Sequence, residues 1–224
     1  MEAVVKLSSL VAVWALALSQ VSPVVEQALT PLTEAIAEAR AREAALPADA
    51  TANERLEVAL ELDQAPLLAM HDIDLSGLSE ADQAAARAEA SARIEAINRE
   101  TVATVVSLTP EEGWFSNQVF SQEAATGAFL VIQHSDVELQ RRYLPALEAM
   151  ANRGEALKWQ YAMLYDRIAV AEGRLQRYGT QMHCVEGRMV PQPTEDPEQI
   201  NERREPMGFR WPDYQAYLAN FGSC

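Results

Sequence analysis

Histidine and cysteine are scarce in this chain of 224 residues, which has three histidines and two cysteines. Neither an HExxH motif nor a paired CxxC motif occurs. Dedicated zinc and other transition-metal sites use such closely spaced nitrogen and sulfur ligands. We therefore expect no metal site and no cofactor, with His183-Cys184 and His134 as the weaker alternative ligand set.

The motifs of well-known enzyme classes are also missing. The chain has no GxSxG elbow, no Walker loop and no GxGxxG turn. These motifs expose a nucleophilic serine or cradle phosphates, so their absence argues against the corresponding hydrolases and nucleotide-binding proteins.

Positive charge is sparse, with 18 lysines and arginines against 33 acidic residues and a formal net charge of -15. Tight binding to nucleic acid or anionic lipid needs a cationic face. We expect no nucleic-acid partner, although a locally basic cleft is compatible with this charge.

Long apolar runs are confined to the N-terminus. Residues 1–22 read as a signal peptide, with Lys6 before an apolar run of residues 7–18 and a small-x-small cleavage pattern near Ala17. Glu2 weakens the positive start. The expected location is periplasmic or secreted, with no stable membrane span after processing. The alternative is an N-terminal membrane anchor, but the run is short of the roughly 20 residues that a span needs.

Export would place Cys184 and Cys224 in a compartment where cysteines form disulfides. Sequence gives no distance between them, and geometry decides bridging. A disulfide that holds the C-terminus and two unpaired thiols are therefore both open.

Residues 23–108 form an N-terminal helical region. Thr30-Pro31 predicts a helix that ends at Pro47, with the threonine as N-cap. Thr51 and Glu54 form a capping box for a second helix, which Pro66 interrupts. Ser79 opens the longest helix, whose apolar stripe reaches Leu108.

Residues 109–224 form a second, more aromatic helical domain. Helices are expected over residues 121–134, 139–152 and 155–172, the last stopped by Gly173. The pattern over residues 185–190 fits a small β-hairpin or an extended loop, and short helices are expected at Asp196-Pro197 and Pro212. The predicted fold is mainly α, an irregular helical bundle with a loop-rich C-terminal third.

Asp166 stands in an apolar stripe formed by Trp159, Met163 and Val170. A buried carboxylate requires a cation or several hydrogen-bond donors. His134, which also falls on the apolar side of its helix, and an arginine are the natural candidates. Arg167 points about 100° away from Asp166 and either borders the same cleft or ties the helix end to the following loop.

The loop after this helix contains Gln176, Tyr178 and Gln181 around Gly179, which permits close backbone approach. Such a loop suits a polar ligand. It equally suits a structural loop whose amides cap exposed backbone groups.

Several elements together resemble one family. They are Trp114, Gln133-His134, Leu164-Tyr165-Asp166-Arg167, Gly173 and Gln176-x-Tyr178-Gly179-Thr180-Gln181. With Pro191, Asp196-Pro197, Asn201, Arg203-Arg204, Gly208 and Tyr214 they resemble the bacterial domain of unknown function 6624 family over residues 95–220. The sequence departs from that pattern at Phe115, where a proline often follows the tryptophan, and at Met182-His183-Cys184.

The resemblance implies no activity, because the family has no established one, but it makes the polar residues the site candidates. As catalytic residues we predict His134, Asp166 and Arg167, and as ligand-binding residues Trp114, Gln176, Tyr178, Gln181 and Arg204.

Three hypotheses follow: an enzyme that acts on a small polar molecule, a non-catalytic binding or interaction protein of the cell envelope, and a purely structural network. A small-molecule ligand is the expected partner in the first two, and the oligomeric state is open.

Overall fold

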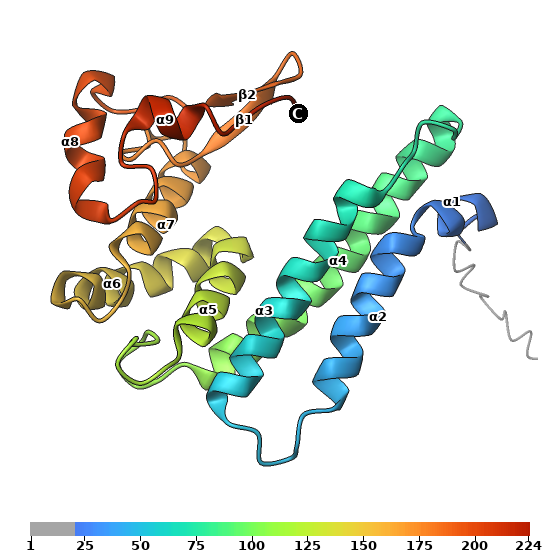
Figure 1. The fold of residues 1–224 in the computed structure, drawn as a ribbon, viewed down its shortest axis with the longest axis horizontal. Helices are drawn as coiled ribbons and strands as arrows, with labels where there is room; N and C mark the ends of the chain where they lie inside the picture. The colour runs from blue at the N-terminus through green and yellow to red at the C-terminus, as the bar shows by residue number, and fades with distance from the viewer. Residues whose placement is uncertain (1–20) are drawn as a thin grey trace, which may run out of the picture.

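A computed structural model describes residues 21–224 (Figure 1). Helices dominate it, and within the described residues the sheet structure is limited to one two-stranded antiparallel hairpin and isolated bridges. The mainly α fold is thus confirmed. The predicted cleavage position near Ala17 and the apolar run around it lie outside the described residues. No helix in the described part is long and apolar enough to cross a membrane.

The N-terminal region contains α1 (Pro23–Ala28), α2 (Thr30–Ala44), α3 (Ala52–Ala69) and α4 (Glu80–Leu108). Figure 1 shows α2, α3 and α4 as long rods that run side by side. The capping box of Thr51 and Glu54 and the cap by Ser79 are both present. Thr30 is not an N-cap, because Leu29 occupies that position and the Thr30 hydroxyl donates to the carbonyl of Gln27.

Pro66 does not interrupt α3, contrary to the sequence-based expectation. The helix continues through Pro66 to Ala69, and a 3₁₀ turn follows at Met70–Asp72. Pro66 is buried in the helix packing. The packing of this face therefore outweighs the backbone hydrogen bond that proline cannot donate.

The second region begins with α5 (Gln122–His134), α6 (Val137–Arg153) and α7 (Lys158–Ala171). Ser121 and Asp136 cap the first two. The third starts at Lys158, later than expected, because Leu157 has an extended backbone and serves as its N-cap. Gly173 follows its end in the left-handed region, as predicted.

A close crossing of α3 and α5 joins the two regions. A Cβ atom on Gly127 would lie 2.7 Å from the carbonyl oxygen of Leu56 and 2.9 Å from Cβ of Leu60. Only glycine permits this approach. The main hydrophobic cluster crosses the expected boundary at residue 108, since it contains Leu56 and Val105 together with Phe129.

The C-terminal third surrounds one end of α7 (Figure 1). It contains the hairpin β1 (Met182–Val185) and β2 (Arg188–Pro191), a 3₁₀ turn (Pro197–Gln199), α8 (Ile200–Arg204), a second 3₁₀ turn (Glu205–Met207) and α9 (Tyr214–Leu218). The hairpin is thus longer than the predicted 185–190, and α9 begins after an Asp213 cap rather than at Pro212. Cys184 and Cys224 form a disulfide with Cα atoms 5.9 Å apart.

Candidate functional site

Asp166 is fully buried and accepts hydrogen bonds from the loop that follows α7. Its carboxylate receives the backbone amides of Arg177 at 2.7 Å, Tyr178 at 3.0 Å and Thr180 at 3.0 Å, and the Thr180 hydroxyl at 3.0 Å. Burial raises the pKa of the Asp166 carboxyl, and these donors act in the opposite direction. The predicted need for several donors is met by the backbone, whereas His134 and a guanidinium are not its direct partners.

Gly179 allows the loop to wrap around this carboxylate. Its φ is +70°, and a Cβ atom there would lie 2.5 Å from the ring of Tyr214. Gln176 completes the loop: its Nε2 donates to the carbonyls of Gln181 and Gln192, and its Oε1 accepts from the amide of Gln181. The side chain of Gln176 is thus committed to holding the loop.

Arg204 on α8 is buried beside this loop. Its guanidinium donates to the carbonyls of Tyr178 at 2.7 Å, Trp211 at 2.8 Å and Pro212 at 3.2 Å. No carboxylate in the described part of the chain forms an ion pair with it, and burial lowers its pKa. An arginine remains protonated nevertheless, so this buried positive charge is stabilised by carbonyl dipoles and by neighbouring aromatic rings instead of an ion pair.

Aromatic rings surround the same guanidinium and open onto a cavity. The carbon Cζ of Arg204 lies 4.3 Å from the ring centre of Phe209 and 4.4 Å from that of Tyr217. The cavity has a volume of about 450 Å³ and is lined by Trp159, Met163, Thr180, Arg204, Gly208, Phe209, Arg210, Trp211 and Tyr217. We call it the Arg204 cavity. Two of these residues are arginines, and none of them is acidic.

His134 lies at the end of α5, and its Nδ1 atom is 2.9 Å from both carboxylate oxygens of Asp63 on α3. The Asp63 side chain is 1% exposed and that of His134 is 23% exposed. The structure therefore places His134 with Asp63 and not with Asp166. Asp63 was missed from the sequence, although the buried positions of α3 at Leu56, Ala59 and Pro66 put it on the inward face.

The other predicted residues are not brought together in one place. Trp114 is buried in the core, where it meets Tyr143 edge-on, and it lines a separate cavity of about 360 Å³. Burial lowers the pKa of Arg167, and its Nε atom has no hydrogen-bond partner in the described chain. Among the predicted residues, Arg204 alone lines the Arg204 cavity, and Gln181 meets it indirectly through a hydrogen bond to Thr180.

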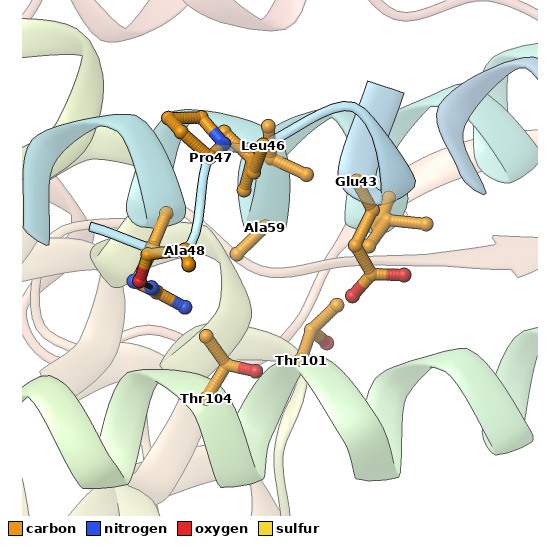
Figure 2. Close-up of a pocket in the computed structure, with 10 residues that line it drawn as sticks. Glu43, Leu46, Pro47, Ala48, Ala59, Thr101 and Thr104 are labelled. Carbon is orange, nitrogen blue, oxygen red and sulfur yellow. Dashed lines mark hydrogen bonds between the residues drawn. The ribbon is translucent and has the colours of Figure 1, made fainter. Parts of the chain in front are cut away.

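Two further cavities have charged side chains that are already engaged. One, of about 240 Å³, lies where Thr101 and Thr104 of α4 face Pro47 (Figure 2). The arginine that lines it, Arg55, donates to backbone carbonyls. A groove of about 600 Å³ between α2, α3 and α5 has Arg42 paired with two glutamates. Both linings also contain glutamates, which the lining of the Arg204 cavity lacks.

No group of three or more histidine, cysteine, aspartate or glutamate side chains in residues 21–224 is arranged to hold a metal ion. In the comparison with family models, the family described as "Family of unknown function (DUF6624)" matches residues 61–221. No curated protein and no solved structure matches the chain.

Proposed function

The chain belongs to the DUF6624 family, and on that premise we propose that it binds a small aromatic molecule with an anionic group in the Arg204 cavity. The observation that carries this proposal is the composition of the lining. A chain with a net charge of -15 presents here two arginines, four aromatic rings and no carboxylate.

The two arginines have different parts in this proposal. Arg204 exposes almost no surface, and its donors are engaged with carbonyls, so it contributes positive potential from beneath the cavity. Arg210 is exposed, and its Cζ lies 4.7 Å from the ring centre of Trp211. Because the side chain is exposed, its N–H groups can donate hydrogen bonds to a carboxylate or phosphate of the ligand.

The aromatic residues supply the remaining binding energy. Trp159 and Tyr217 offer ring faces and edges to a planar ligand, and such contacts contribute roughly 0.5–1.5 kcal/mol each beyond area burial. Trp211 is 36% exposed at the mouth and loses that exposure when a ligand covers it. A volume of about 450 Å³ accommodates a molecule of roughly drug size.

Calorimetric titration tests the proposal with 2-naphthoate as the probe and 2-naphthalenemethanol as its uncharged counterpart. We expect naphthoate to bind more tightly, and Arg210→Gln to reduce that preference while leaving the affinity for the alcohol unchanged. Arg188→Gln on the exposed face of β2 is the matched control and leaves both affinities unchanged. Equal affinity for the two probes, or no binding of either, contradicts the proposal.

A second candidate function is proton-transfer catalysis by His134, favoured by its pairing with Asp63. In the neutral tautomer that carries its hydrogen on Nδ1, the carboxylate accepts that hydrogen and Nε2 is left to accept a proton, the arrangement used by general-base histidines. Turnover of p-nitrophenyl esters that is lost in His134→Gln but retained in His71→Gln, at an exposed position, supports it. Turnover that is equal in both variants speaks against it.

We also propose that the protein is exported to the periplasm or secreted. The apolar N-terminal run and the Cys184–Cys224 disulfide support this proposal, because disulfides persist in oxidising compartments. Expression of the full chain followed by fractionation and N-terminal sequencing tests it, with a new N-terminus near residue 17 as the expected result.

A further inference from the structure

A smaller cavity, separate from the Arg204 cavity, lies between the start of α5 and the start of α7. It has a volume of about 200 Å³. Buried apolar side chains, including Phe115 and Ala156, form part of its wall. The hydrogen-bonding residues in the lining are Asn117, Gln122, Thr126 and Gln160.

Gln160 is the unusual member of this set. Its side chain is buried, with 2% of the residue exposed, and its Nε2 atom has no hydrogen-bond partner in the described chain. An amide donor that is removed from water and gains no hydrogen-bond partner in the protein costs its full free energy of desolvation. Nε2 itself exposes almost no surface to the cavity, so a turn of the terminal amide about its last side-chain bond is needed to bring its N–H groups to an acceptor oxygen there.

The lining restricts the kind of ligand. None of the residues that line the cavity is charged, in a chain with a net charge of -15. A charged ligand would lose its hydration without gaining an opposite charge. Three of the polar residues end in carboxamides, each of which offers a donor and an acceptor in one plane, and another carboxamide complements that pattern.

We propose that this cavity binds a small uncharged molecule with a primary carboxamide group, whose carbonyl oxygen accepts a hydrogen bond from Nε2 of Gln160. The volume of the cavity corresponds to roughly seven molecules of liquid water, which limits the ligand to the size of a blocked amino acid or smaller. The site is independent of the Arg204 cavity, so either proposal can fail alone.

Nuclear magnetic resonance of the full chain tests the proposal directly, with N-acetylglycinamide as the probe. The side-chain NH₂ signals of Gln160 are identified by their loss in Gln160→Met, which preserves length and removes the donor. We expect a saturable shift of these signals in the wild type and a loss of affinity of about tenfold or more in the variant. Gln215→Met, on the exposed face of α9, is the matched control and binds like the wild type.

Three outcomes overturn the proposal: no saturable shift, an equal response to propionate or glucose, or unchanged affinity in Gln160→Met. The melting temperature of this variant is a second readout. Removal of an unpaired donor should leave it unchanged or raise it, and a clear fall marks Gln160 as a structural residue instead. Should Gln160→Met fail to fold, Thr126→Val removes a hydroxyl from the same lining at equal volume and should also weaken binding.

Discussion

Asp63 on α3 holds Nδ1 of His134 on α5, with both carboxylate oxygens 2.9 Å from that nitrogen. The two residues are 71 positions apart in sequence. The Asp63 side chain is 1% exposed, and its other side-chain donor is the adjacent Gln64. The imidazole is thus the main group that compensates the burial of the carboxylate, and the pair connects the N-terminal helices to the second region.

Replacement of His134 alone should be more damaging than replacement of both members of the pair. His134→Leu leaves a buried carboxylate without its imidazole, and we expect a loss of about 2–4 kcal/mol in the free energy of unfolding. The double variant Asp63→Leu/His134→Leu removes the carboxylate as well and should recover part of that loss. Urea denaturation measures both, and a double variant less stable than the single one contradicts the argument.

Asp166 should be a determinant of loop structure. Asp166→Asn replaces one acceptor oxygen by an NH₂ group that faces backbone donors, so we expect a loss of about 2–4 kcal/mol in unfolding free energy. Thr180→Val removes one donor of the same network and should cost about 1 kcal/mol. Hydrogen exchange provides the local readout: the amides of Tyr178 and Thr180 should exchange faster in Asp166→Asn, and unchanged protection would contradict the assigned role.

Local signals in the sequence located most of the helices. The capping residues Thr51, Ser79 and Ser121 predict helix starts because a side-chain oxygen and the amide that it accepts are only three residues apart. The continuation of α3 through Pro66 was missed because the burial of that proline depends on distant parts of the chain.

The site was harder to predict for the same physical reason. The inward position of Asp166 was deduced correctly from helical periodicity, but its donors come from a loop whose path depends on Gly179 packing against Tyr214. The periodicity of α5 and α7 gave no distance between His134 and Asp166, and it contained no information on Asp63. The aromatic residues around Arg204 lie in a segment without clear helical or strand periodicity. Their arrangement around the guanidinium, and the cavity beside it, could therefore be recognised only in the structure.

Two glycines with the same backbone conformation allow two costs of a Gly→Ala substitution, backbone strain and steric overlap, to be measured separately. Gly179 and Gly187 have φ values of +70° and +78°, but a Cβ atom would meet Tyr214 and Ile200 at the first position and nothing within 4 Å at the second. Gly187→Ala should therefore cost about 1–2 kcal/mol, from the left-handed backbone alone. Gly179→Ala should cost about 3 kcal/mol or more, because the buried Tyr214 ring must also move. Equal losses in thermal or urea denaturation would show that the loop yields without disturbing Tyr214.

Reduction of the Cys184–Cys224 disulfide should loosen the C-terminal segment before the rest of the chain. The bond spans 40 residues, for which chain entropy gives an upper value of about 4 kcal/mol. The amide of Met189 donates to the carbonyl of Gly222, so the tail lies along β2 and can detach without disturbing the helices. We expect Cys184→Ser/Cys224→Ser to lose about 1–4 kcal/mol and to expose the Met189 amide to hydrogen exchange. A reducing agent should shift the urea midpoint of the wild type but not that of the double variant. A wild-type midpoint that does not move, with Met189 still protected, would show that the backbone pairing alone holds the tail.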